Sequence, residues 1–410
     1  MNIWLISLFD PTPLDDPIYP RFIGVAEAAL KKGHQVTHFT STFRHTVKDH
    51  RFEESTTKLI KPGYTVHFTK SMGYRKNKSP KRFIAHWNYA NTLIEDFNRL
   101  ESPDIIFMSM PPLSTVNKVS KWAVEQKIPV ILDIIDPWPD SFIKDVPSSF
   151  KPFATLFLKP FYDKLRRSFK RCTAITAISN GYLEWASNFH SEGKPTKAFF
   201  LAIDLDAIQN ELLHFRKEKK DNDPLRIIYA GSLASSYDIP TIIEAAKIIE
   251  KSYPNQTRFI ITGKGPQSSL IIAAQGEVKN IEYLGWVSKE ELIKQYALAD
   301  LGLIQHKNSL TQTITYKFFN YMSAGLPLLN SLQSEMADLI NKHELGLNNE
   351  EQDVRGLVRN VESYIQNREL LRRHSVNALA FTKKYGDTKV VYGNLVDFLE
   401  QNAKAPYRVC

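Results

Sequence analysis

Hydrophobic and polar residues alternate along the chain in blocks that predict strands followed by helices. Residues 2–9 form an apolar run typical of a buried strand, and residues 22–32 carry apolar side chains at helical spacing until Gly33. Residues 35–40 predict a second strand, so the chain begins with a βαβ unit. Residues 44–82 are polar, basic and interrupted by Gly and Pro, and long loops are expected there. A helix at about 83–99 and three further strands complete this half, the strands at 104–108, 129–134 and 174–178.

A second strand–helix alternation begins near Arg226, after a highly polar segment at 211–224 that is typical of a linker. Because these strands are apolar throughout and separated by helices, they predict a parallel sheet covered on both faces. The final stretch, 368–401, has a helical pattern interrupted near Tyr385 and Gly386. The predicted strands of this half are 226–230, 258–262, 281–284, 301–305 and 326–330.

The segment Thr315–Leu329 is the most informative part of the chain, because it predicts a short helix that ends at Gly325 and leads into a buried strand. Open α/β sheets bind ligands outside the carboxyl ends of their strands, and a helix N-terminus there attracts anions such as phosphate. Lys317 falls in the first helical turn, where a cation is mildly unfavourable by about 0.3–1 kcal/mol. Either a neighbouring anion explains this lysine, or its side chain simply points into water.

Three turns of the second half share one pattern, in which a buried strand is followed by glycine and then by a helix start. They are Gly231–Ser232, Gly263–Lys264 and the helix at Thr315. Glycine allows a ligand to approach the backbone closely, so three such turns along one sheet edge predict a phosphate-binding edge. Neither G-x-G-x-x-G nor GxxxxGK[ST] is present, which argues against a standard dinucleotide or P-loop site.

Composition sets outer limits on these expectations. The 410 residues suggest two to three domains, and 43% hydrophobic with 24% charged residues is ordinary for a globular protein. No secretory signal, no apolar run of about 18 residues and no Cys/His cluster is visible, so a cytoplasmic protein without a metal site is expected. The net charge is +9, and residues 1–200 account for all of it, with 28 Lys and Arg against 19 Asp and Glu. An anionic partner is therefore expected, although not nucleic acid, whose binding motifs are absent.

Residues 151–171 form a basic amphipathic stretch, with seven basic residues against one acidic residue and apolar side chains between them. Such a segment suits the surface of an anionic bilayer. A core helix with a solvated basic face gives the same pattern, so both interpretations stand.

Five segments together resemble a family-4 glycosyltransferase of the GT-B fold, from the bacterial branch that builds surface polysaccharides. The most specific segment is 315–327, which is similar to the family's K-L-F-E-Y-M-A-A-G-x-P motif. The loop 132–140 resembles the branch's Arg-Asp-Leu-Trp-Pro loop, with Ile135 in place of the arginine. The other three are 31–37, similar to GH-x-V-T, 171–179, similar to A-D-x-I-x-x-x-S, and 280–287, similar to N-V-x-F-L-G-x-V.

The resemblance implies an α/β protein with two facing Rossmann-like domains and a C-terminal helix that crosses back to the first domain. Residues 1–205 would bind the acceptor, 206–224 would form a linker, 225–385 would bind the nucleotide-sugar, and 386–410 would pack on the N-terminal domain. The reaction would move a sugar from a nucleotide-diphosphate sugar, such as a UDP-sugar, with retention of configuration and without a metal or other cofactor. Lys317 and its helix N-terminus would stabilise charge on the leaving diphosphate.

The site residues implied by the resemblance come from both domains. Asp136, Lys317 and Asn320 are expected to act in catalysis. For Asp136, stabilisation of its own loop is an equally good interpretation. For the neighbouring Trp138, two interpretations stand: the ring stacks on a sugar, or it only fills the surface of the domain. The donor is expected to bind at Gly231, Ser232, Gly263, Lys264, Val287, Gln312, Thr313, Ile314, Lys317 and Asn320.

The sequence departs from the family at several of these positions. The family usually has two glutamates, eight positions apart, that contact the sugar and the ribose. This chain has Gln312 and Asn320, whose amides can hydrogen-bond hydroxyls but carry no charge. Many relatives also place Arg and Lys after the first glycine turn, whereas 233–238 holds no basic residue here. Lys264 is a candidate to replace part of that positive charge.

The leading hypothesis is a hexosyl- or N-acetylhexosaminyl-transferase that extends a lipid-linked oligosaccharide in O-antigen, lipopolysaccharide or capsule biosynthesis. It would lie peripherally on an anionic membrane surface, at the inner face of the cell membrane. One alternative is a sugar-nucleotide epimerase of the same architecture, which needs a cluster of acidic and histidine groups that is not visible here. The other is a non-catalytic homologue that binds a nucleotide or a partner only, and Gln312 and Asn320 keep it open.

Overall fold

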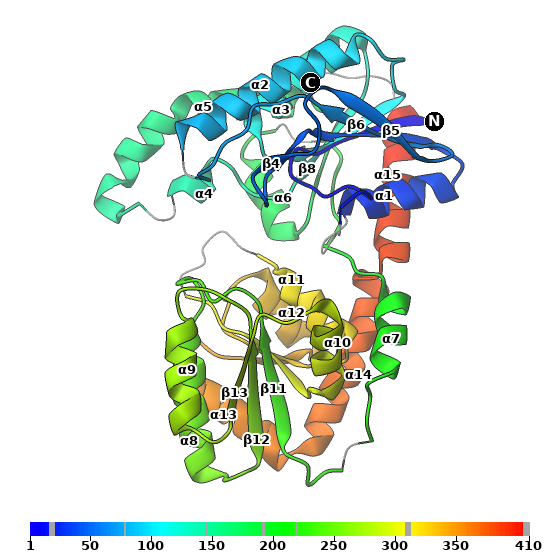
Figure 1. Cartoon of the computed structure of the whole chain (residues 1–410). Helices are drawn as coiled ribbons and strands as arrows, with labels where there is room; N and C mark the ends of the chain where they lie inside the picture. Colours follow the sequence, from blue (N-terminus) through cyan, green and yellow to red (C-terminus); the bar gives the residue numbers. More distant parts are fainter. Residues whose placement is uncertain are drawn as a thin grey trace. The chain divides into compact units, whose positions relative to one another are not determined.

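The protein, in a computed structural model, forms two compact units. The structure describes residues 1–15, 21–77, 79–143, 146–190, 193–218, 220–307 and 313–404. Unit 1 contains Met1–Phe200 and the chain from Val391 onward, and unit 2 contains Leu201–Val390. Each unit has a mainly parallel sheet with helices on both faces (Figure 1). Within the described ranges, no helix is both long and apolar enough to cross a membrane.

Unit 1 is built on an eight-stranded sheet with the order β10-β9-β8-β7-β1-β2-β6-β5. Its strands are β1 (Asn2–Ile6), β2 (Gln35–Ser41), β5 (Thr56–Lys61), β6 (Tyr64–Thr69), β7 (Ile105–Met110), β8 (Val130–Ile134), β9 (Ala174–Ala177) and β10 (Thr196–Ala198), and β3 (Phe43–Arg44) and β4 (Asp49–His50) form a separate ribbon. Its helices are α1 (Arg21–Lys31), α2 (Pro80–Phe97), α3 (Leu113–Gln126), α4 (Asp140–Ile143), the 3-10 turn η1 (Ser148–Phe150), α5 (Lys151–Arg171), α6 (Asn180–Ser187) and most of α15 (Thr388–Lys404).

The expectation of long loops over 44–82 is wrong for much of that segment. Strands β5 and β6 form an antiparallel hairpin at the edge of the sheet, turning at Gly63, whose φ is +80°. Strand β6 is buried at every position except Thr65, which is partly buried, as is typical of a strand covered on both faces of its sheet. Strand β5 is mostly exposed, and its Lys and Thr residues are typical of an edge strand that avoids further pairing. Those polar residues concealed the strand in the sequence.

The C-terminal helix α15 packs on the first segments of the chain. The ring of Phe398 lies 5.8 Å from the ring of Phe199, and Glu400 Oε1 lies 2.7 Å from Nε2 of His34. Tyr392 lies against Gly24, where a Cβ atom would come within 2.3 Å of the tyrosine ring. Glycine at this position therefore allows the helix to seat closely.

Unit 2 has a six-stranded parallel sheet with the order β13-β12-β11-β14-β15-β16. All five strands predicted for this half are present, and β16 was not predicted. The strands are β11 (Leu225–Ala230), β12 (Thr257–Thr262), β13 (Ile281–Gly285), β14 (Leu301–Ile304), β15 (Leu328–Asn330) and β16 (Gly346–Asn348). The helices are α7 (Leu205–Leu213), α8 (Ile239–Ser252), α9 (Ser268–Glu277), α10 (Lys289–Leu298), α11 (Tyr316–Ser323), α12 (Glu335–His343), α13 (Val354–Gln366) and α14 (Arg368–Tyr385).

The strand order of unit 2 reverses between β11 and β14. From β11 the chain proceeds outward to β12 and β13, and then returns to β14 on the other side. The flanking connections consequently leave the sheet in opposite directions, and open α/β sheets commonly bind ligands at such a reversal, outside the carboxyl ends of the two strands. The candidate residues of the glycine turns and of α11 belong to this edge.

Candidate active site

Two connecting segments are joined above the carboxyl ends of β11 and β14. The N–H of Asp238 donates to the carbonyl of Gln305 at 3.1 Å, and the N–H of Lys307 donates to the carbonyl of Ser236 at 2.8 Å. Tyr237 and His306 form the antiparallel bridge between them, with ring centroids 4.7 Å apart. The segment after β11 is thus held over the reversal point of the sheet.

Lys317 extends from the first turn of α11 into this corner. Its side chain is 9% exposed, and Nζ lies 3.9 Å from the ring centroid of Tyr229 and 4.1 Å from that of Tyr237. Among the described residues, Nζ has no hydrogen-bond partner. Burial lowers the pKa of Lys317 to about 7. Two aromatic faces compensate the ammonium only in part, so an anion is the missing partner that this geometry favours.

Glycine at position 231 makes room for the lysine. A Cβ atom there would lie 2.7 Å from Cε of Lys317, and the φ of +145° is rarely adopted by other residues. The helix start itself is open to a ligand, because Thr315 at the N-cap makes no side-chain capping bond and its buried Oγ1 has no partner among the described residues. The N-terminus of α11 and Lys317 therefore present positive charge in the same place.

The glycine turns after β11, β12 and β13 are hydrogen-bonded to one another. Gly231 N donates to Thr262 O at 3.0 Å, and Gly263 N donates to Gly285 O at 2.8 Å. Lys264 is exposed at the tip of the second turn. The structure thus brings Gly231, Ser232, Gly263 and Lys264 to one edge, with Val287 two residues beyond Gly285.

The remaining predicted residues are placed as follows. Asn320 lies one turn after Lys317 on α11 and is half-buried, while Ile314 is buried just before the helix. The carbonyl of Thr313 accepts a bond from Ser334 Oγ at 2.7 Å. Gln312 lies outside the described residues.

Asp136 belongs to unit 1, in the loop after β8. Its Oδ2 accepts a bond from Trp138 Nε1 at 2.9 Å, and its Oδ1 accepts one from Ser141 Oγ. Trp138 is 5% exposed and its ring lies 4.5 Å from that of Phe142. In this structure the carboxylate holds the loop and its tryptophan, and a contact with substrate stays a prediction.

Sequence reasoning missed Tyr229 and Tyr237, the two rings around Lys317. Tyr229 occupies a strand position where an aromatic residue is ordinary, and Tyr237 lies in a loop six residues after Gly231. Nothing in their spacing connects them to a lysine about eighty residues later. The one signal was the tyrosine in an otherwise small and polar loop.

Replacing Gly263 by alanine tests how closely these turns must approach. A Cβ atom there would lie 1.7 Å from the carbonyl oxygen of Gly231, at a φ of +139°. We expect Gly263→Ala to destabilise unit 2 by about 3 kcal/mol or more, measured by urea unfolding. Gly276→Ala is the control, because nothing lies within 4 Å of that position in α9 and alanine should add roughly 0.5–1 kcal/mol. Equal stability of the two variants would refute the close approach.

Comparison with known proteins agrees with this architecture. A family model described as glycosyl transferases group 1 matches residues 224–367. A search of curated proteins gives no match. Among solved structures, the chain is similar to sucrose-phosphate synthase from Thermosynechococcus elongatus, with a TM-score of 0.67, 12% identity and 98% of each chain covered. It is also similar to an alpha,alpha-trehalose-phosphate synthase (UDP-forming) from Burkholderia vietnamiensis, with a TM-score of 0.71, 12% identity and coverage of 98% and 100%.

A third similar structure is that of HepE from Anabaena in complex with UDP. Its TM-score is 0.65 at 12% identity, and the alignment covers 98% of this chain and 99% of that one. Together the fold and the family match confirm the predicted GT-B architecture and the prediction of a glycosyltransferase enzyme. The surface-polysaccharide branch is a narrower assignment that these matches leave as a prediction.

Proposed function

We propose that this protein moves a sugar from a nucleotide-diphosphate sugar, foremost a UDP-sugar, to a hydroxyl of a glycan acceptor with retention of configuration. The observation that carries the proposal is Lys317, a buried ammonium group without a hydrogen-bond partner among the described residues. It lies at the start of α11, against the glycine turn after β11. The similar HepE structures hold UDP and UDP-glucose, which supports the same class of donor here.

The proposed chemistry follows from where the positive charge lies. The bond between the anomeric carbon and a phosphate oxygen breaks, and its electron pair stays on the diphosphate. The acceptor hydroxyl oxygen forms the new bond to that carbon, and its proton passes to the leaving phosphate or to solvent. Lys317 and the first turn of α11 would stabilise the charge that develops on the diphosphate, without a metal ion. Asn320, one turn further, would bind a hydroxyl of the transferred sugar.

We further propose that the acceptor is a lipid-linked oligosaccharide of O-antigen or capsule synthesis, met at the inner face of the cell membrane. The support lies in α5, whose buried residues all fall in its second half. Phe153, Leu156 and Phe157 share one face and are 72%, 68% and 79% exposed. Figure 1 shows this first half of α5 extending outward from unit 1.

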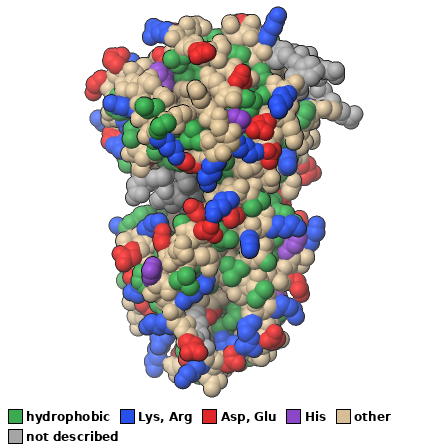
Figure 2. Space-filling view, turned by 90° about the vertical axis from the view of Figure 1, so that its right-hand side faces the viewer, with side chains coloured by type: hydrophobic (Ala, Val, Ile, Leu, Met, Phe, Trp, Pro, Cys, Tyr) green, Lys and Arg blue, Asp and Glu red, His purple; other side chains and the backbone are tan. Residues whose placement is uncertain are grey.

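A second helix enlarges this apolar surface. On α2, Phe83, Ile84 and Trp87 are exposed, and the ring of Phe83 lies 6.3 Å from that of Phe161 on α5. Helix α5 carries seven basic residues and one acidic residue, and Lys151 and Lys159 belong to the same half of the helix as the exposed apolar side chains. In the face drawn in Figure 2, Lys and Arg side chains are interspersed with Asp and Glu on both units. An anionic bilayer fits a helix that combines exposed apolar side chains with an excess of basic residues.

The variant Phe153→Ser/Phe157→Ser should bind vesicles containing phosphatidylglycerol at least about tenfold more weakly than the wild type. Each phenylalanine contributes roughly 1.5–3 kcal/mol when fully transferred from water, so partial insertion of two rings accounts for that loss. Cosedimentation at two salt concentrations measures it. The control Leu213→Ser/Val376→Ser removes two exposed apolar side chains of unit 2 instead. If the two double variants bind equally well, or if the wild type binds neutral vesicles as strongly as anionic ones, this surface is excluded as the membrane-binding site.

A donor screen tests the transfer reaction itself. Purified protein is incubated with radiolabelled UDP-sugars, other nucleotide-diphosphate sugars and a membrane lipid extract. The proposal requires transfer of label to the lipid fraction from at least one donor, dependent on Lys317. Absence of transfer with every donor, together with no nucleotide binding by calorimetry, would overturn it. Conversion of the UDP-sugar without an acceptor would instead indicate an epimerase.

A further inference from the structure

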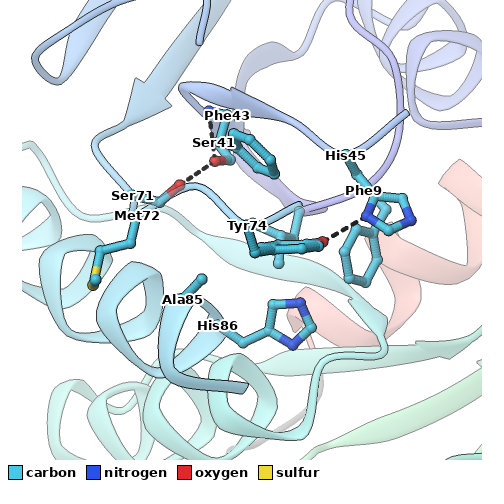
Figure 3. Close-up of a pocket in the computed structure, with 10 residues that line it drawn as sticks. Phe9, Ser41, Phe43, His45, Ser71, Met72, Tyr74, Ala85 and His86 are labelled. Carbon is cyan, nitrogen blue, oxygen red and sulfur yellow. Dashed lines mark hydrogen bonds between the residues drawn. The ribbon is translucent and has the colours of Figure 1, made fainter. Parts of the chain in front are cut away.

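The pocket of unit 1 drawn in Figure 3 has room for little more than a water molecule. It lies among rings that include Phe9, Tyr74 and His86, and its cavity volume of about 10 Å³ fits roughly one water. The hydroxyl of Tyr74 is hydrogen-bonded there to Nδ1 of His45 at 2.5 Å. The carboxyl edge of the sheet in unit 2, by contrast, contains a buried ammonium group that a ligand has to reach.

Nζ of Lys317 is enclosed in this structure. The atom is buried and lies between the rings of Tyr229 and Tyr237, whose centroids are 3.9 Å and 4.1 Å away. A charge-assisted hydrogen bond from an ammonium group to a phosphate oxygen has a length of about 2.7–2.9 Å. Because Nζ is buried, a phosphate oxygen can come that close only if one wall of the enclosure moves.

Tyr237 is the wall that can move most easily. Tyr229 is 0% exposed on β11, and its hydroxyl donates to a backbone carbonyl at 2.6 Å. The stem of Lys317 is confined beside Gly231, where a Cβ atom would lie 2.7 Å from Cε. Tyr237 is only half-buried and ends a turn, residues 234–237, whose other side chains are Ala and Ser. Such a turn can shift without unpacking large side chains from the core.

Gln267 holds this turn from the neighbouring glycine loop. Its side chain is 9% exposed, and Nε2 donates to the carbonyl of Ala234 at 2.6 Å and to that of Tyr237 at 3.0 Å. On the other side of the turn, the N–H of Lys307 donates to the carbonyl of Ser236 at 2.8 Å. One glutamine amide therefore provides two of the hydrogen bonds that keep the tyrosine in place.

The residues that flank the turn are anchored independently of Gln267 Nε2. Leu233 and Asp238 are 0% and 1% exposed. The N–H of Leu233 donates to the carbonyl of Lys264 at 3.0 Å, and that of Asp238 donates to the carbonyl of Gln305 at 3.1 Å. The turn can consequently move while both of its ends remain fixed.

We infer that Tyr237 covers Lys317, that Gln267 holds it there, and that the diphosphate of the donor displaces it. The ring and the phosphate compete for one ammonium group, and a charge-assisted hydrogen bond is stronger than a contact with a ring face. Opening has a cost, which lowers the apparent affinity for the donor because only a fraction of the molecules is open. The identity of the displacing ligand rests on the proposed function, whereas the cover itself does not.

Acylation of Lys317 measures access to Nζ without any donor. The full chain is treated briefly with the N-hydroxysuccinimide ester of acetic acid, and each lysine is quantified by mass spectrometry. Lys289, which is 74% exposed, is the internal reference. Gln267→Met keeps the length of the side chain but removes both hydrogen bonds, which water can replace only in the open arrangement. The ratio of Lys317 to Lys289 labelling should therefore rise at least about threefold in Gln267→Met, and further in Tyr237→Ser.

Calorimetric titration of UDP tests the displacement. Gln267→Met and Tyr237→Ser should each bind UDP at least about threefold more tightly than the wild type, with unchanged affinity for uridine. Gln275→Met is the matched control, because this exposed glutamine of α9 accepts the N–H of Tyr283 at 2.5 Å and does not hold the turn. It should resemble the wild type in both measurements. Circular dichroism checks that Gln267→Met is folded, and Tyr237→Ser supplies the test if it is not.

The two measurements distinguish failure of the cover from failure of the donor proposal. Raised labelling of Lys317, with no UDP binding by any of the proteins, would support the cover and contradict the donor proposal. Unchanged labelling in the folded variants would overturn the inference. So would UDP affinity that is equal to or lower than that of the wild type, since the turn would then be a fixed wall of the binding site.

Discussion

Lys317→Met should abolish sugar transfer and at the same time make the protein more stable. Methionine keeps the length and apolar stem of lysine but cannot hold a diphosphate. Removal of one preorganised donor to developing negative charge lowers kcat by about 10²–10³-fold in comparable sites. The stability gain arises because the wild type buries this ammonium between Tyr229 and Tyr237 with no hydrogen-bond partner among the described residues.

The stability difference should depend on pH in a defined direction. Burial lowers the pKa of Lys317 to about 7, whereas an unfolded chain has the ordinary value near 10.5. Between these values the unfolded chain binds more protons, so the stability of the wild type rises with pH. Below pH 7 both states are protonated and the full cost remains, on the order of a few kcal/mol. The advantage of Lys317→Met should therefore be largest below pH 7 and shrink towards pH 10.

Lys289→Met is the matched control for this prediction. Lys289 is 74% exposed on α10 and pairs with Glu211, so its loss should change neither transfer nor stability by much. Chemical denaturation at pH 6, 8 and 10 and initial rates with the best donor measure the two effects. Near wild-type turnover of Lys317→Met would remove this lysine from the site.

Arg21→Met should destabilise unit 1 by about 3–5 kcal/mol, because it leaves the carboxylate of Asp133 buried without its cation. Nε and Nη2 of Arg21 donate to the two carboxylate oxygens at 2.8 and 2.9 Å, and the side chains are 2% and 0% exposed. Thr176 Oγ1 donates to the same carboxylate at 2.7 Å, and Arg21 also donates to the carbonyls of Phe199 and Phe200. This network joins α1 to β8, β9 and the segment that follows β10.

Two further variants decide whether the unpaired charge causes the loss. Arg21→Met/Asp133→Leu removes both partners and should recover part of the stability, since apolar replacements of buried pairs are often neutral. Lys121→Met breaks the exposed pair with Glu125 and should cost under about 1 kcal/mol. Urea unfolding followed at a probe in unit 1 measures all three. A double variant no more stable than Arg21→Met would point to lost packing instead of an unpaired carboxylate.

The sequence predicted those parts of the fold that depend on local periodicity. The strands of unit 2 are apolar throughout and separated by amphipathic helices, so periodicity located them within a few residues. Strand β5 was not predicted, because an edge strand needs only half of its residues to be apolar and Thr and Lys occupy most of this one. Strand β16 was not predicted, because its three residues, Gly346–Asn348, are too few to show an alternation of apolar and polar positions.

In the candidate site, the sequence could predict only those neighbouring residues that the order of strands and helices brings to the same edge of the sheet. Glycine after a strand and a lysine in the first turn of a helix placed Gly231 and Lys317 at one sheet edge. The rings that enclose the lysine, and the pairing of Arg21 with Asp133 across 112 positions, depend on tertiary contacts that no local pattern records.

Calorimetric titration of UDP and of uridine into the wild type and Lys317→Met tests the central claim most directly. If Lys317 and the start of α11 hold the diphosphate, UDP binds the wild type at least tenfold more tightly than the variant. Uridine, which lacks the phosphates, should then show equal affinity for both proteins. At pH 8 UDP binding should also take up protons, because an anion beside Lys317 raises its pKa from about 7. Equal UDP affinity for the two proteins, with no proton uptake, would contradict the account.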